Sequence, residues 1–494
     1  MPAQIAISTP DVFPSRGTSR GAGGVVPRAD ARLEAIAARV DAGERLTIAD
    51  GEVLFTTPDV WTVCALANRV ARRLHGDVGY YNVNRHLNYS NICALSCTFC
   101  EFYRKEGQEG AYTRDMAYVR EQVRQAVEAG ATEMHCVGGL HPKLPWSYYP
   151  ELVATIRDEA KRCGSNLHVK AFTAVEIVHL AKIAKKYSVD DRKAGIRWVL
   201  EELRAAGLGS LPGGGAEVFD DRVHDEAYKG KIRSDVWLDV HRVAHEIGLN
   251  TNATLLYGHI ETRHDRLVHM DMLRTAQDEA LARLGYEGTG DWALGTGASA
   301  PQPESESGHL GYREGTSNAP VITLTRPGTL KPLDMLARQR AASATSAQCP
   351  VPSALPGAQC PVPSASGYYQ TIIPLPFFPD GSELEDRPGP TGLENLRTLA
   401  IARLMLDNFP HVKAFWIMQT VAMAQLMLQS GADDIDGTVV WYDITKVGGA
   451  STHQEVTVAT LTKAIRDAGL RPVERDTLYR PVKREGKRWS VASV

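Results

Sequence analysis

Hydrophobic residues along this 494-residue chain recur in two alternating patterns. Spacings of three and four residues predict amphipathic helices, and the short apolar runs between them have the length of buried strands. The predicted strands cover residues 78–84, 133–137, 166–172, 210–211, 250–257, 369–375, 412–418 and 435–440. The predicted helices cover residues 31–42, 58–74, 115–129, 148–162, 174–186, 190–206, 234–247, 263–284, 391–407, 419–430 and 455–468.

Eight strands, each followed by at least one helix, predict an α/β protein with a (β/α)8 barrel of the TIM type. An open, doubly wound parallel sheet is the alternative, because that fold also alternates strands with helices. In a barrel, the chemistry lies in the loops that follow the carboxyl ends of the strands. Those loops are therefore the place to look for candidate site residues.

Two stretches interrupt the alternation of elements. Residues 1–28 have no helical or strand period, and we expect a disordered leader. Residues 286–367 are rich in Gly, Ser, Pro, Ala and Thr, and residues 347–354 repeat almost unchanged at 358–365. We predict a low-complexity surface insertion there. The barrel is then divided between residues 29–285 and residues 368–494, the latter including a C-terminal segment.

The charge balance argues against a nucleic-acid or anionic-membrane partner. Lys and Arg number 55 and Asp and Glu 58, so the net charge is −3, without the basic excess that such partners require. No apolar run approaches the ~18 residues of a membrane span, and the first thirty residues lack the apolar core of a secretory signal. We therefore expect a cytoplasmic protein in a reducing compartment.

The sharpest chemical feature is a group of three cysteines, Cys93, Cys97 and Cys100, within one loop after the first predicted strand. Three thiolates so close together suit a [4Fe–4S] cluster, and three protein ligands leave one iron able to bind a small molecule. A structural zinc site with His86 or His141 as fourth ligand is the alternative. It fits less well, because structural zinc ligands usually come as separated pairs.

Other polar and glycine residues follow later strands, and each has a simpler interpretation beside the functional one. Gly213–Gly215 is either a turn only or a backbone approach to a ligand, and His135 and Cys136 favour a place in the core. His259 and Glu261 alternate along a strand end with Tyr257, so all three could face one side. For the carboxylates between Asp433 and Asp436, we favour capping and solvation over metal binding.

The spacing C-x3-C-x-aromatic-C, with Phe99 as the aromatic residue, resembles that of the radical S-adenosylmethionine (SAM) enzymes. The resemblance implies that the remaining iron chelates the amino and carboxylate groups of the methionine part of SAM. It also implies that Phe99 lies near the adenine and that Gly138 and Gly139 help to hold the methionine amine. The implied cofactors are a [4Fe–4S] cluster and SAM, the latter consumed as a co-substrate.

A narrower resemblance, to the aminofutalosine (aminodeoxyfutalosine) synthase family of the menaquinone futalosine pathway, covers most of the chain. The cyclase of that pathway and the deazaflavin-cofactor synthases are close relatives and give the alternative reactions. The insertion and the stretch 441–452 depart from the family pattern. The segments that carry the resemblance are residues 82–88, 137–142, 170–176, 211–217, 251–254, 257–262, 436–438 and 474–480.

This family resemblance implies a transferase that adds the 5′-deoxyadenosyl radical to 3-[(1-carboxyvinyl)oxy]benzoate, with rearrangement and decarboxylation, giving 6-amino-6-deoxyfutalosine. It also implies an electron donor such as flavodoxin or ferredoxin. An iron–sulfur electron carrier and a scaffold protein without a cluster are rival functions from other classes. Because the acceptor carries two carboxylates, it needs cationic or hydrogen-bonding partners. The candidates are Arg85, His86, His141, Lys170 and His259.

The remaining candidates are two carboxylates, Glu176 and Glu217, at the ends of the third and fourth predicted strands. They could hold the ribose hydroxyls or the amino group of SAM. The sequence does not rank these residues against one another. For Arg85, an ion pair within the scaffold is the alternative to a role in binding.

Overall fold

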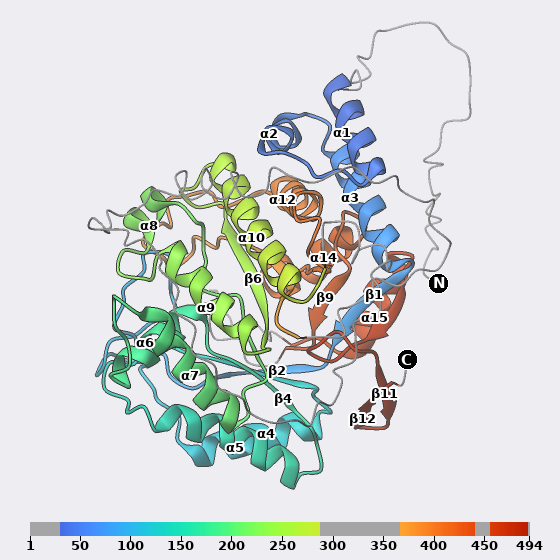
Figure 1. Ribbon diagram of the computed structural model, residues 1–494. Helices are drawn as coiled ribbons and strands as arrows, with labels where there is room; N and C mark the ends of the chain where they lie inside the picture. The colour runs from blue at the N-terminus through green and yellow to red at the C-terminus, as the bar shows by residue number, and fades with distance from the viewer. Residues whose placement is uncertain (1–29, 287–365, 440–454, 493–494) are drawn as a thin grey trace, which may run out of the picture.

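The computed structural model describes residues 30–286, 366–439 and 455–492, which form a barrel of parallel strands surrounded by helices (Figure 1). The predicted leader, most of the predicted insertion and the stretch 441–452 lie outside the described residues. Within the described part of the chain, no helix is long and apolar enough to cross a membrane.

Seven strands form one parallel sheet in the order of the sequence. They are β2 (Asn84–Asn88), β3 (Glu133–Val137), β4 (His168–Ala171), β5 (Ser210–Leu211), β6 (Asn250–Tyr257), β7 (Tyr369–Pro376) and β8 (His411–Val412). β6 and β7 precede and follow the 287–365 stretch, yet they pair directly, from Thr251↔Tyr369 to Tyr257↔Pro376.

A second parallel sheet, in the order β10-β1-β9, completes the ring of strands. It is formed by β1 (Val78–Asn82), β9 (Asp434–Gly437) and β10 (Arg471–Glu474). A parallel bridge between Lys413 and Asp434 joins β8 to β9, and β1 continues through Val83 into β2. Among the described residues the pairing therefore passes through eight strand positions, which confirms the predicted α/β barrel. An antiparallel hairpin of β11 (Val482–Glu485) and β12 (Arg488–Val491) follows.

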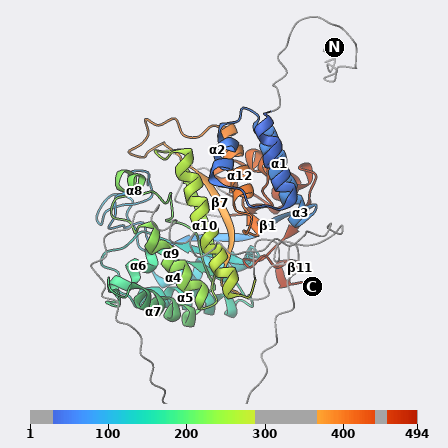
Figure 2. The ribbon, with the colours of Figure 1, turned by 45° about the horizontal axis from the view of Figure 1, so that its top comes forward.

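Helices surround the barrel, with α1, α2, α3 and α12 packed together on one side (Figure 2). Threonines at the amino ends of α2, α6 and α10 form capping boxes with acidic residues three positions later. The helices are α1 (Ala31–Ala42), α2 (Ile48–Thr56), α3 (Val60–His75), α4 (Met116–Glu128), α5 (Tyr148–Arg162), α6 (Ala174–Ile183), α7 (Arg192–Ala206), α8 (Asp221–Ala227), α9 (Ser234–Glu246), α10 (Arg263–Arg283), α12 (Gly392–Met405), α13 (Trp416–Gln419), α14 (Val421–Leu428) and α15 (Val458–Asp467).

The interior of the barrel carries charged residues. Lys170 bonds to Glu133 at 2.7 Å, and Lys413 bonds to Asp436 at 2.7 Å. Arg475 completes the group with Asp434 at 2.6 Å. All six residues are buried, so each charge depends on its partner, and removing one partner of such a pair typically costs about 3–5 kcal/mol.

Two local predictions are wrong. The strand expected over 412–418 ends at Val412, and α13 follows; a short apolar run fits a buried strand or a buried helix equally well. The carboxylates of Asp433, Asp434 and Asp436 are buried and paired with cationic or imidazole groups, where solvated carboxylates were expected. Sequence periodicity does not show which cations the fold brings to these positions.

Candidate active site

The three-cysteine loop follows β2 and is fixed by backbone hydrogen bonds to two other segments. The amide of Cys93 donates to the Arg104 carbonyl at 3.0 Å, and the amide of Ala94 donates to the Leu140 carbonyl at 2.9 Å. The Lys105 ammonium donates to the carbonyls of Cys93, Ala94 and Leu95 at 3.1, 3.3 and 2.9 Å. These contacts set the loop's path independently of any ligand.

Cys93, Cys97 and Cys100 are free thiols, and all three line one cavity of about 290 Å³ at the carboxyl end of the strands. Burial raises the pKa of the Cys97 thiol to about 11 and also raises that of Cys100. Iron binding displaces such thiol protons. Three convergent thiols without a disulfide partner fit three legs of a [4Fe–4S] cluster, with cavity space left beside them.

Gly138 and Gly139 follow β3 and line the same cavity. A Cβ at Gly139 would lie 2.4 Å from the Ile92 carbonyl oxygen, and one at Gly138 would lie 2.7 Å from the Tyr89 ring. Only glycine allows this approach to the start of the cysteine loop. The pair therefore has a packing role, and it also presents backbone to the cavity.

Glu176 joins the glycine pair to α6. One carboxylate oxygen accepts hydrogen bonds from the Tyr89 hydroxyl at 2.8 Å and the Gly138 amide at 3.0 Å. The other accepts from the amide and hydroxyl of Thr173 at 2.7 and 2.8 Å. Burial raises the pKa of Glu176 to about 7, against the effect of these four hydrogen bonds. Since a carboxylate accepts about four bonds, this side chain is saturated by the protein.

Glu217 also lines the cavity. Its backbone φ of +48° is a left-handed value that is uncommon for a residue with a side chain. Its carboxylate pairs with the Lys231 ammonium, which lies 4.9 Å from the centre of the Phe99 ring. Phe99, in turn, packs edge-to-face on Tyr228 at 5.8 Å. The structure thus brings Phe99 and Glu217, both predicted site residues, to the same wall of the cavity.

The predicted glycine run after the fourth strand also reaches the cavity, through Gly214 and Gly215. A Cβ at Gly213 would lie 2.6 Å from the Ala253 backbone, so this position combines a tight turn with strand packing. Gly214 and Gly215 present backbone to the cavity, and the predicted approach of this glycine run to a ligand stays a prediction.

Other predicted candidates do not line this cavity. Arg85 points to α4, where it donates to Gln125 at 2.8 Å. His86 lies inside the barrel with its ring 4.4 Å from that of His135, and Lys170 is paired with Glu133 in the same interior. Their predicted contacts with substrate stay predictions.

Two further histidines hold local structure. The Nδ1 atom of His141 accepts hydrogen bonds from the amides of Lys143 and Leu144, both at 3.1 Å, which fixes the turn after the glycine pair. His259 is buried beside Glu261 at 3.5 Å and packs against Phe377. Neither residue lines the cysteine cavity, and their predicted roles in the reaction are untested.

Sequence reasoning missed several residues of this cavity. They come from loops without a recognisable motif, so only the fold reveals their position. The charge of Lys231 does not set it apart among the 55 Lys and Arg residues of the chain. The missed lining residues include Tyr103, Lys231, Asp380 and Met418.

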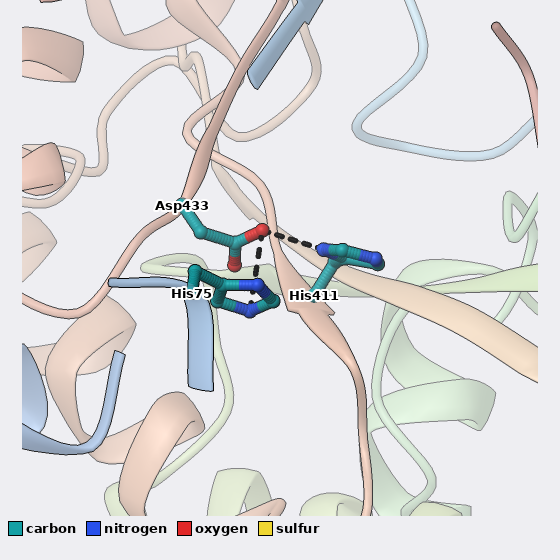
Figure 3. A group of neighbouring side chains, drawn as sticks. All are labelled: His75, His411 and Asp433. Carbon is teal, nitrogen blue, oxygen red and sulfur yellow. Dashed lines mark hydrogen bonds and ion pairs between the residues drawn. The ribbon is translucent and has the colours of Figure 1, made fainter. Parts of the chain in front are cut away.

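A second group of ligand-type side chains, His75, His411 and Asp433, lies at the amino-terminal end of the strands (Figure 3). His411 Nδ1 lies 2.6 Å and His75 Nε2 lies 3.6 Å from the same Asp433 oxygen. His75 Nε2 also lies 2.9 Å from the Pro410 carbonyl, so this nitrogen donates a proton and offers no lone pair to a metal. We interpret the group as part of the scaffold.

Comparison with known proteins agrees with this geometry. The Radical SAM superfamily model matches residues 87–273, and the CofH/MqnC C-terminal region matches residues 365–487. Two solved structures share the fold. Methylornithine synthase has a TM-score of 0.54 and 14% identity over 88% of this chain and 97% of its own length. The FeFe-hydrogenase maturase HydG from Carboxydothermus hydrogenoformans has a TM-score of 0.55 and 12% identity over 90% of this chain and 80% of its own length.

Full-length relatives give a finer assignment. An aminodeoxyfutalosine synthase from Thermus thermophilus is 36% identical over 92% of this chain and 97% of its own length, and one from Streptomyces coelicolor is 35% identical over 89% and 92%. A 5-amino-6-(D-ribitylamino)uracil–L-tyrosine 4-hydroxyphenyl transferase from Methanopyrus kandleri is 29% identical over 91% and 95%. The chain therefore belongs to the aminodeoxyfutalosine synthase family of radical SAM enzymes, which use a [4Fe–4S] cluster and SAM.

Proposed function

We propose that this enzyme joins the 5′-deoxyadenosyl group of SAM to 3-[(1-carboxyvinyl)oxy]benzoate and forms 6-amino-6-deoxyfutalosine. The carbon–sulfur bond of SAM breaks and methionine leaves. The adenosyl carbon bonds to the methylene of the enolpyruvyl group, and the aryl group migrates from oxygen to carbon. The carboxylate then leaves as carbon dioxide and gives up one electron, so the electron that cleaved SAM is recovered and the product is a closed-shell ketone. The observation that carries the proposal is one cavity lined by Cys93, Cys97, Cys100 and the glycine pair, in a chain of this family.

A [4Fe–4S] cluster held by the three cysteines supplies, when bound, the electron that cleaves SAM. An electron donor such as flavodoxin or ferredoxin would bring the cluster to its reduced state before turnover. The protein contributes position and shelter, since the cavity lies at the end of the barrel among apolar residues that include Leu256, Leu375 and Phe377.

For SAM itself, we assign contacts to the walls of this cavity. The backbone of Gly138 and Gly139 would hold the methionine part, and Phe99 would lie beside the adenine. Glu217, with only one carboxylate oxygen paired to Lys231, remains able to accept from the ribose hydroxyls or the amino group. Glu176 is saturated by four internal bonds, which supports a positioning role through Gly138.

Product analysis tests the proposal. The reconstituted enzyme is incubated without oxygen with dithionite, SAM labelled with ¹³C in the adenosyl group, and the enolpyruvyl benzoate. Mass spectrometry should find the label in 6-amino-6-deoxyfutalosine, with one methionine and one carbon dioxide per product. Release of the label as free 5′-deoxyadenosine, with the benzoate unchanged, would point to the hydrogen-abstracting reactions of the related cyclase and deazaflavin-cofactor synthases.

A further inference from the structure

A second cavity, of about 550 Å³, adjoins the cysteine cavity and shares the residues Glu101 and Phe102 with it. It runs along β2, which pairs only with β3 among the described strands. The far side of this cavity is formed by α4, through Gln122 and Gln125. The two cavities are therefore neighbours at the same end of the barrel.

Charge differs between the two cavities. The carboxylates that line the cysteine cavity are Glu101, Glu176, Glu217 and Asp380, with Lys231 as the cation among its described lining residues. That excess of acid suits the sulfonium and ammonium groups of SAM. The second cavity is lined by Arg104 and Arg114, with the shared Glu101 as the carboxylate of its described lining. The positive charge of these two arginines exceeds the negative charge of Glu101, so this lining suits an anionic ligand.

Of the two arginines that line this cavity, Arg104 donates through Nη1 to the carbonyls of Glu101 and Tyr103, so Arg114 is the less committed cation. Its guanidinium lies 4.0 Å from the Tyr112 ring centre and 4.4 Å from that of Tyr118. Its Nε is buried without a hydrogen-bond partner, and no carboxylate of the described residues pairs with it. Aromatic contacts hold a guanidinium in place while leaving its N–H edge for a carboxylate.

Arg85 lies behind the two glutamines of α4 that line the second cavity. It donates to Gln122 at 3.4 Å and to Gln125 at 2.8 Å, and both glutamines line the cavity. Its own Nε is buried without a hydrogen-bond partner. The Glu455 carboxylate acts on Arg85 electrostatically, but no described carboxylate forms a direct ion pair with it. A buried cation without a direct partner is costly to the fold, which makes this arrangement a candidate anion site.

We propose that the second cavity binds the ring carboxylate of an aryl enolpyruvyl ether, with Arg114 as its direct partner. This inference rests on the proposed function. The methylene that reacts must lie beside the adenosyl carbon of SAM in the cysteine cavity, and the enolpyruvyl carboxylate on the neighbouring carbon stays close to it. The ring carboxylate, across a meta-substituted ring, is the group that reaches the second cavity.

A matched pair of ligands tests this assignment. Binding of 3-[(1-carboxyvinyl)oxy]benzoate and of 2-phenoxyacrylate, which lacks the ring carboxylate, is measured by calorimetry on the cluster-loaded enzyme with SAM and without reductant, so that no turnover occurs. Arg114→Gln should weaken binding of the benzoate about 10- to 100-fold, as expected for a charge-assisted hydrogen bond. The same variant should change binding of 2-phenoxyacrylate less than about threefold. Arg114→Lys should fall between wild type and Arg114→Gln for the benzoate.

Arg124→Gln, a change at an exposed arginine on the neighbouring helix α4, is the matched control and should bind both ligands as wild type does. Equal weakening of both ligands by Arg114→Gln, or no weakening of either, would overturn the assignment. If wild-type enzyme binds the benzoate through Arg114 but does not convert it, the proposed function fails and the carboxylate site stands. If it does not bind the benzoate at all, both fail.

Discussion

The two ends of the barrel gather reactive side chains in opposite ways. At the amino-terminal end, the Asp433 carboxylate accepts from His411 at 2.6 Å (Figure 3). It also accepts from the Val412 amide at 2.8 Å, and the Tyr479 ring stacks 3.5 Å from that of His411. At the carboxyl end, three cysteine thiols face a cavity of about 290 Å³. One end is filled by its own partners, and the other leaves space for a ligand.

This difference teaches that residue type alone does not identify a site. Two histidines and an aspartate are a common metal-ligand set, yet here one imidazole nitrogen is committed to a backbone carbonyl and the rings pack against their neighbours. Cysteines are as often core residues as ligands, yet here three of them converge on open volume. Unfilled space beside the ligand-type side chains distinguishes the functional end from the scaffold end.

The largest effect should come from removing one thiol at the cavity end. Cys97→Ala should abolish SAM cleavage, because two cysteines no longer hold the cluster. Iron and sulfide content after anaerobic reconstitution, together with methionine release, measures the loss. The circular dichroism spectrum should stay that of the wild type, since the loop is also held by backbone bonds. Retained SAM cleavage would contradict the assignment of the cluster ligands.

At the scaffold end, Asp433→Ala should reduce the free energy of unfolding by about 2–5 kcal/mol, because it leaves two buried donors, the Val412 amide and the His411 imidazole, without their acceptor. Urea titration of the cluster-free protein measures the effect. The folded fraction should still cleave SAM once loaded with the cluster. Loss of SAM cleavage without loss of stability would show that this group takes part in function. It would contradict the contrast between a scaffold end and a functional end of the barrel.

Acid should destabilise the protein through its buried histidines. Burial lowers the pKa of His75 to about 3 and that of His168 to about 4, whereas the unfolded chain titrates near 6.5. Below pH 6.5 the unfolded state therefore binds more protons, and stability falls by about 1.4 kcal/mol per pH unit for each such group. Urea midpoints between pH 7.5 and 5.5 should decrease, and a His75→Gln variant should show a shallower slope. An equal slope in the variant would argue against a neutral His75.

The smallest effect is expected at Glu176, where the cavity meets its scaffold. Glu176→Gln places an amide N–H₂ where two donors converge, which should cost about 1–3 kcal/mol of stability. The substitution weakens the hydrogen bond that holds the Gly138 amide, so it should raise the KM for SAM more than it lowers kcat. Initial rates across SAM concentrations separate the two parameters. An unchanged KM would restrict Glu176 to a role in stability.

Much of the fold was predictable because it depends on local pattern. The strands 133–137 and 250–257 and the helix 148–162 match the structure at both ends. Helix boundaries follow from capping chemistry close in sequence, as at Thr173 and Glu176. The short helix α8 and the C-terminal hairpin lacked such a pattern and were missed.

For the site, the sequence identified the residues that form a local motif. Cys93, Cys97 and Cys100 lie within one loop, so their spacing alone indicates their chemistry. Residues that meet only through folding could not be found in this way. Lys231, from the segment before α9, reaches Glu217 and Phe99, and Arg114 reaches the second cavity from the loop before α4.

By itself, the sequence determined the order of strands and helices, the cysteine loop and the family, because each depends on residues close together in the chain. Only the tertiary structure decided which charged residues are committed to one another and which face open space. Glu176 and Glu217 follow similar strand ends, yet Glu176 is saturated by four hydrogen bonds, whereas Glu217 pairs with Lys231 through one carboxylate oxygen. That distinction depends on distances between strands, which no local pattern records.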